Sequence, residues 1–189
     1  FCGVALFCLL DDFIEMWYGK EFVAPLVFVV LLTLDFYIHC MYQPLSMMIE
    51  VFGEFKALKQ QEMFCMVLNI LISLSLIKPF GIVGPVMGTF VVDIFTTLFR
   101  MYTILYKHYR KDMKGFVGQY LVYLLIFVAE YVGAYFLCSR IPLEASWISF
   151  IVKGILCFVI TMSINIIVFY RSKEFAYLKD TMLSVIKKG

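Results

Sequence analysis

Five long apolar stretches constrain this chain more than any other feature of its sequence. They occupy residues 22–42, 58–77, 82–106, 116–137 and 147–170. Each approaches or exceeds the roughly 20 residues that an α-helix needs to cross the hydrocarbon core of a bilayer. Only 16% of the 189 residues are charged, against about 25% in soluble domains. Because a helix satisfies its own backbone hydrogen bonds in lipid, we predict an all-α fold, a polytopic transmembrane helical bundle.

The first ten residues are also apolar, and Asp11 and Asp12 follow them directly. A secretory signal peptide would carry a basic leader and a small-residue cleavage site, and residues 1–10 have neither. We therefore interpret residues 1–10 as the end of a sixth span whose beginning is missing. On this interpretation the chain is the C-terminal part of a longer protein.

Lysine and arginine alternate between low and high numbers from one connection to the next. There is one in 11–21, two in 50–62, one in 78–81, four in 107–115, one in 138–146 and five after residue 170. Cytoplasmic loops of membrane proteins carry the excess of basic residues. The alternation therefore predicts that the basic connections and the C-terminus lie in the cytoplasm.

The tail, residues 172–189, places apolar side chains three and four positions apart. This spacing predicts an amphipathic helix on the cytoplasmic membrane surface. A frayed chain end is an equal alternative.

Ionisable side chains inside a span are costly, so each is a candidate functional site. Asp35 and His39 lie one helical turn apart on the same face of the first full span. As a carboxylate–imidazole pair they would carry a proton, because imidazole titrates near neutral pH. The alternative is a structural pair that binds a neighbouring helix.

Arg100 and Lys153 are the candidate anion-binding residues. The planar guanidinium of Arg100 suits a phosphate or pyrophosphate if it faces a cavity; alternatively, Arg100 snorkels to the nearby membrane surface, as we expect of Lys153. Asp93 and Glu130 are intramembrane charges of unknown role. Asp93 shares a helix face with Arg100, whereas Glu130 has no partner in its own helix and needs a proton or a cation from another helix.

Small and polar residues flank the short turn at 78–81. Asn69, Ser73 and Ser75 precede it, and Gly84 and Gly88 follow it. Small residues four positions apart let two membrane helices approach closely, and polar side chains then bond across the interface. We predict an antiparallel hairpin in which these residues serve packing rather than chemistry.

The remaining residue patterns exclude several function classes. The six cysteines form no CxxC pair and lie almost entirely within apolar spans, which argues against a disulfide framework and against a metal site. No nucleophile elbow or phosphate-binding glycine loop is present. We therefore expect no enzyme activity, no metal, no cofactor and no nucleic-acid partner.

Four stretches, in order along the chain, resemble the bacterial polysaccharide flippases of the multidrug/oligosaccharidyl-lipid/polysaccharide exporter superfamily. They are MWYGKEFV at 16–23, GEFKALK at 53–59, LNILISLSLIKPFGIVGPVMGT at 68–89 and SKEFAYLKD at 172–180. The third is similar to the most recognisable stretch of that family, a helix with Asn and Ser followed by a Phe-Gly-Ile-x-Gly turn.

The resemblance implies a two-lobed transporter of the bacterial plasma membrane, of which this chain is the C-terminal lobe. Such a transporter flips an undecaprenyl-pyrophosphate-linked oligosaccharide by alternating access for surface polysaccharide export. Its partners would be that lipid-linked substrate, membrane lipids and the missing N-terminal lobe of the same protein. Arg100 and Lys153 then become candidates for holding the anionic cargo, and Asp35 and His39 for ion coupling.

Two rival interpretations stay open. A cation-coupled multidrug or metabolite exporter of the same superfamily would share the fold, and Asp35 would then matter most. A membrane scaffold or an embedded glycan-processing enzyme belongs to another class. The sequence upstream of this chain would discriminate among them.

Overall fold

The computed structural model describes residues 1–109, 113–139, 147–170, 172, 175 and 177, and all regular structure in these residues is helical. The α-helices are α1 (Cys2–Trp17), α2 (Leu26–Val51), α3 (Phe55–Phe80), α4 (Val83–Tyr102), α5 (Met113–Ser139) and α6 (Trp147–Phe169). A 3-10 turn, η1 (Lys20–Phe22), precedes α2, and a π-helical segment, η2 (Thr103–Tyr109), extends α4. Five helical segments are long and apolar enough to cross a membrane. The predicted all-α, multi-span class is confirmed.

Two helices extend beyond the apolar stretches that the sequence predicts as spans. The stretch 1–10 lies within α1, which continues to Trp17, and Asp12 of α1 pairs with a lysine of α6. The stretch 22–42 lies largely within α2, which continues through Pro44 to Val51. A proline removes one backbone hydrogen bond, but the residues after it bury apolar side chains and so hold the helix together.

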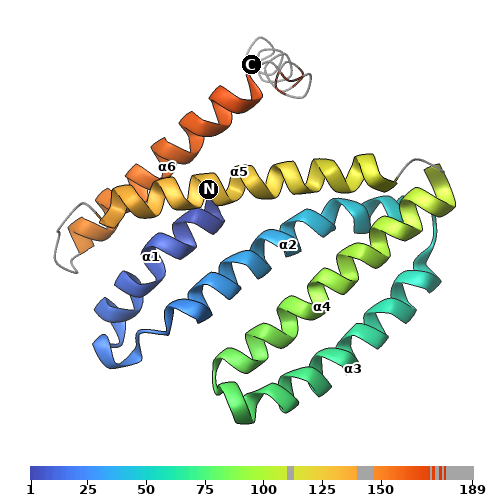
Figure 1. Ribbon diagram of the computed structural model, residues 1–189, viewed down its shortest axis with the longest axis horizontal. Helices are drawn as coiled ribbons and strands as arrows, with labels where there is room; N and C mark the ends of the chain where they lie inside the picture. The colour runs from blue at the N-terminus through green and yellow to red at the C-terminus, as the bar shows by residue number, and fades with distance from the viewer. Residues whose placement is uncertain (110–112, 140–146, 171, 173–174, 176, 178–189) are drawn as a thin grey trace, which may run out of the picture.

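The helices form two groups that meet along α1 and α2 (Figure 1). In the first group, α3 and α4 lie antiparallel as a hairpin, and α2 packs along α4. In the second group, α1 packs against α5 and α6, which cross each other. The first group therefore contains most of the candidate site residues, and Lys153 and Glu130 belong to the second.

The turn between α3 and α4 is as tight as the sequence predicts. A Cβ atom added to Gly84 would lie 2.5 Å from the carbonyl oxygen of Leu76, and one added to Gly88 would lie 2.6 Å from Ser73 Oγ. Across the same interface, Asn69 Nδ2 donates a hydrogen bond to Thr89 Oγ1 at 3.2 Å. The predicted packing role is confirmed for Asn69, Ser73, Gly84 and Gly88. It is wrong for Ser75, which is exposed and donates a hydrogen bond to Leu71 O of its own helix.

The basic segments 50–62 and 107–115 adjoin the end of α2, the start of α3, the end of η2 and the start of α5. These four helix ends lie together at the right of Figure 1. Lys107 of η2 forms a 2.5 Å ion pair with Glu54, which precedes α3. This arrangement agrees with the alternation of basic residues, which requires both connections on one side of the membrane. The predicted amphipathic tail, 172–189, lies outside the described residues except for three positions.

Candidate functional site

Arg100 is the centre of a polar cluster formed by α2, α3 and α4. It projects from α4 and is only 3% exposed. Its guanidinium donates hydrogen bonds to Ser46 Oγ of α2 and to Glu62 Oε1 of α3, and it lies over the ring of Tyr42, 4.5 Å from the ring centroid. Arg100 therefore points into the helix group and does not snorkel to the surface.

The charge on Arg100 is only partly satisfied by these contacts. Its Nε is buried and has no hydrogen-bond partner, although a guanidinium carries five donors in a fixed planar arrangement. The side chain of Glu62, in contrast, is 60% exposed. Arg100 is thus paired with a carboxylate that is itself mostly exposed, beside an open cavity that both residues line.

His39 joins the same cluster through Tyr42. The hydroxyl of Tyr42 lies 2.6 Å from His39 Nδ1, and Asp93 Oδ2 of α4 lies 3.4 Å from the same nitrogen. Gln43 Nε2 lies 3.1 Å from the other ring nitrogen. The carboxylate paired with the imidazole is therefore Asp93 on the neighbouring helix, which the sequence had left without a role.

Asp35 lies one turn before His39 on α2, as the sequence predicts. It interacts electrostatically with Asp93 and with His39, and its Oδ1 is buried without a hydrogen-bond partner. Two carboxylates, one on α2 and one on α4, thus act electrostatically on one imidazole.

Two open cavities expose the cluster on either side of Glu62. One has a volume of about 250 Å³ and reaches Asp93. The other has a volume of about 350 Å³ and reaches Arg100 and Ser46. Tyr42 and Glu62 line both cavities.

Lys153 and Glu130 lie apart from this cluster, in the second helix group. Lys153 Nζ donates a 2.5 Å hydrogen bond to Asp12 Oδ2 of α1, and its side chain is only 12% exposed. Glu130 accepts a 2.6 Å hydrogen bond from Asn165 Nδ2 of α6. The predicted sites thus divide into one set of four, with Asp35, His39, Asp93 and Arg100, and two separate pairs.

Sequence reasoning missed three members of the cluster: Ser46, Tyr42 and Glu62. Glu62 lies on α3, inside the predicted span 58–77, and was not among the intramembrane charges proposed as sites. The available signal was a charged residue beside an apolar stretch, but nothing in the sequence indicates that its partner is Arg100. Among the described residues, no group of three or more His, Cys, Asp or Glu side chains is arranged to hold a metal ion.

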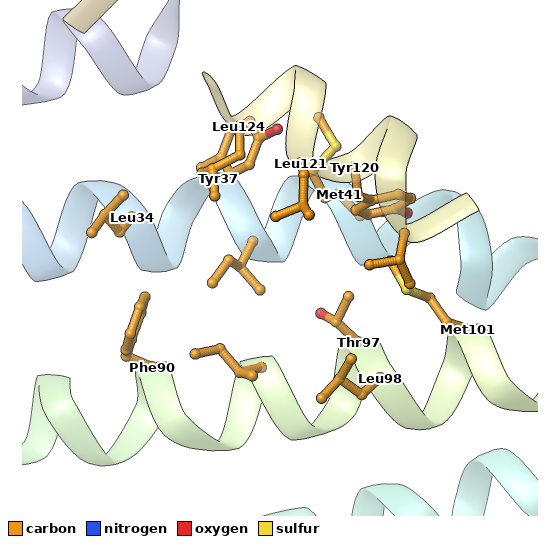
Figure 2. Close-up of a pocket in the computed structure, with 13 residues that line it drawn as sticks. Leu34, Tyr37, Met41, Phe90, Thr97, Leu98, Met101, Tyr120, Leu121 and Leu124 are labelled. Atoms are coloured by element: carbon orange, nitrogen blue, oxygen red, sulfur yellow. The ribbon is translucent and has the colours of Figure 1, made fainter. Parts of the chain in front are cut away.

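An apolar cleft of about 340 Å³ lies on the other side of α2 and α4, where α5 covers them (Figure 2). Figure 2 shows Tyr37 of α2 beside Leu124 of α5, and Phe90, Thr97 and Leu98 of α4 pointing toward α2 from below. Its lining is almost entirely carbon and sulfur. The cleft separates the polar cluster from the second helix group.

The chain matches no protein-family model, no curated protein and no solved structure. Its resemblance to the polysaccharide flippases therefore stays a prediction from the quoted stretches.

Proposed function

We propose that this chain is the C-terminal lobe of a bacterial polysaccharide flippase, which moves an undecaprenyl-pyrophosphate-linked oligosaccharide across the plasma membrane by alternating access. The observation that carries the proposal is the buried guanidinium of Arg100, which has an unused donor and faces an exposed carboxylate. The quoted sequence resemblance supports the same assignment. The alternation of basic residues supports a cytoplasmic position for the two basic connections and for the C-terminus.

Glu62 acts in this proposal as a replaceable partner of Arg100. A buried arginine without a counter-charge is strongly unfavourable, so the empty site keeps the carboxylate of Glu62 in place. A pyrophosphate offers several acceptor oxygens in the planar, bidentate geometry that arginine prefers. Because Glu62 is mostly exposed, it can turn toward the 350 Å³ cavity while the cargo takes its position.

In this proposal, the pair of His39 and Asp93 couples the binding of a proton to the binding of the cargo. Tyr42 contacts His39 through its hydroxyl and Arg100 through its ring. A proton that binds between Asp93, Asp35 and His39 changes the charge one side chain away from the pyrophosphate site. Loading of the cargo and loading of the proton are therefore linked through Tyr42.

Lys153 is the second anion contact of the proposal, and it lies in the other helix group. Its partner Asp12 stands in the same relation to it as Glu62 to Arg100. Both side chains of this pair are more than three-quarters buried, so the exchange of partners is more restricted there. We assign Arg100 the larger share of cargo binding.

The test is a flipping assay with the full-length protein in proteoliposomes. The substrate is a fluorescent undecaprenyl-pyrophosphate-linked sugar, and an impermeant quencher reports which leaflet holds it. Arg100→Gln is expected to reduce the flipping rate at least about tenfold, which equals the loss of roughly 1.4 kcal/mol of charge-assisted binding. Arg100→Lys is expected to restore only part of it, because lysine lacks the bidentate fork.

The matched control is Glu21→Gln, which removes a charge from an exposed position in η1. It should flip at the wild-type rate. Wild-type protein that flips no faster than empty liposomes would reject the proposed function. Equal rates for wild type and Arg100→Gln would reject the role of Arg100.

A further inference from the structure

Carboxylates outnumber basic groups in the two cavities beside the Arg100 cluster. Glu62 lines both cavities, Asp93 lines the smaller one, and Glu50 lines the larger one. Among the residues that line either cavity, Arg100 is the one with a basic side chain. The described walls of the proposed cargo site therefore combine one guanidinium with several carboxylates.

The charges of these carboxylates are matched to different degrees. Glu62 pairs with Arg100, and Asp93 Oδ2 lies 3.4 Å from His39 Nδ1. The side chain of Glu50 differs from both, because it is exposed and forms no ion pair with another residue that the structure describes. Glu50 thus brings an unmatched negative charge to the cavity that contains Arg100.

Glu50 also lies close to the proposed position of the pyrophosphate. It follows Ser46 by four positions on α2, so the two side chains share one helix face, with their Cβ atoms roughly 5–6 Å apart. Ser46 accepts a hydrogen bond from Arg100. A sugar joined to a pyrophosphate at Arg100 therefore lies within reach of the Glu50 carboxylate.

The other polar groups of the two cavities are uncharged. They include the amides of Gln43 and Asn69 and the hydroxyl of Thr96. Such groups donate and accept hydrogen bonds, as the hydroxyl groups of a sugar do. A carboxylate on the sugar would instead face like charges, and like-charge repulsion is a common means by which binding sites reject the wrong partner.

From these observations we propose that the sugar nearest the pyrophosphate is neutral or carries an amino group, and that Glu50 rejects sugars that carry a carboxylate. This inference rests on the proposed flipping function and adds the charge of the sugar to it. A free amino group would gain Glu50 as its counter-charge. Glu50 is thus a specificity-determining residue, whereas Arg100 holds the pyrophosphate that every cargo shares.

The test compares three cargos in proteoliposomes that contain the full-length protein. All three carry undecaprenyl pyrophosphate and the same sugar ring, as glucose, glucosamine or glucuronic acid. We expect the glucuronic acid cargo to flip at least about tenfold more slowly than the glucose cargo, because its carboxylate meets like charges. The glucosamine cargo should flip at least as fast as the glucose cargo.

Glu50→Gln tests the assigned residue, because glutamine keeps the size of the side chain and removes its charge. We expect the ratio of the glucose rate to the glucuronic acid rate to fall at least about threefold. Both rates come from one preparation, so a loss of folded protein cancels in the ratio. Glu21→Gln, which removes an exposed carboxylate in η1, should keep the wild-type ratio.

Salt separates charge repulsion from a steric effect. Because mobile ions screen exposed charges, the ratio should fall toward one between about 0.1 and 1 M salt. Equal wild-type rates for the glucose and glucuronic acid cargos, or a ratio that neither Glu50→Gln nor salt changes, would overturn the inference and leave the proposed function standing. If the wild type flipped none of the three cargos faster than empty liposomes, the proposed function would be rejected, and this inference with it.

Discussion

The two helix groups hold their intramembrane charges in different ways. In α2, α3 and α4, Asp93, His39, Tyr42, Arg100 and Glu62 touch one another in an unbroken series. In α1, α5 and α6, the charges form separate pairs, Lys153 with Asp12 and Glu130 with Asn165. In a connected series, a proton gained by one side chain can change the contacts of the others. In a separate pair, only the contact between its two members can change.

The two groups also differ in how closely neighbouring atoms approach the glycines of their helices. In the hairpin of α3 and α4, Gly84 and Gly88 have no room for a Cβ atom. In α5, a Cβ atom added to Gly118 or Gly133 would meet nothing within 4 Å. Close backbone packing therefore fixes α4 against α3, whereas α5 has open space at these two glycines; the tight glycine of the second group is Gly3 of α1, where an added Cβ atom would lie 3.0 Å from the Phe127 ring. Four predictions test this contrast.

The largest effect is expected from Gly84→Ala. The new methyl group would lie 2.5 Å from the Leu76 carbonyl oxygen and 2.8 Å from Ile77 N. These are backbone atoms, so the two helices must separate. We expect a loss of about 3 kcal/mol or more in the free energy of unfolding, at the upper end of overpacking effects, measured by SDS-induced unfolding.

Gly133→Ala is the matched control for this prediction. It lies in a helix with open space at its Cβ position, where alanine favours the helix by up to about 1 kcal/mol. Equal stabilities of the Gly84 and Gly133 variants would remove the packing contrast between the two groups.

The second prediction compares the loss of one partner in each group. Glu62→Gln leaves the guanidinium of Arg100 buried without a counter-charge, and arginine cannot give up its proton. We expect a loss of about 3 kcal/mol. Asp12→Asn is expected to lose about 1 kcal/mol, because the flexible stem of Lys153 can reach toward the membrane surface from the first turns of α6.

SDS-induced unfolding of the two variants, measured side by side, decides this comparison. If Asp12→Asn lost more unfolding free energy than Glu62→Gln, the contact of Asp12 with Lys153 would contribute more to stability than the contact of Glu62 with Arg100. The contrast between a connected series and isolated pairs would then have no energetic basis.

The membrane spans and the hairpin could be predicted because they depend on local signals. Apolar length identifies a span, and small residues four positions apart identify a close helix contact. The partners of the charges could not be predicted in this way. Arg100 and Glu62 are separated by 38 positions, and their meeting depends on how α3 and α4 are rotated about their axes. The same is true of His39, for which the sequence suggested Asp35 and the structure supplies Asp93.

The continuation of α2 through Pro44 depends on tertiary contacts in the same way. Proline signals the end of a helix locally, but Leu45 and Ile49 are almost fully buried against Met101 and Ile104. Tertiary burial thus outweighs the local signal. Ser46, whose hydroxyl accepts a hydrogen bond from Arg100, lies in the part of α2 that follows the proline.

The third prediction concerns the pH dependence of flipping. If the series from Asp93 to Arg100 carries the coupling, His39→Asn should remove most of the variation of the flipping rate between about pH 5 and 8, the range in which histidines generally serve as pH switches in proteins. The groups that face His39 are Asp35, Asp93 and Tyr42. In proteoliposomes, the flipping rate of His39→Asn should differ from the wild-type rate by up to about tenfold at one end of this pH range. At the other end the two rates should be nearly equal.

Gln43→Ala is the control for His39, because it removes a neighbour of the imidazole that carries no charge. It should keep the wild-type pH profile. A wild-type profile in His39→Asn would instead make the imidazole a structural contact between α2 and α4.

The smallest effect is expected when both members of a separate pair are replaced. The double variant Asp12→Asn with Lys153→Met removes both charges and keeps side chains of similar size. Replacing a buried ion pair by residues without charge is often close to neutral, so we expect the unfolding free energy to change by less than about 1 kcal/mol. The corresponding double variant Glu62→Gln with Arg100→Met should lose more, because Ser46 and Tyr42 also lose a partner. Equal changes in the two double variants would show that Arg100 and Glu62 act as a pair and not as part of a series, and the link from His39 to the pyrophosphate site through Tyr42 would then lack physical support.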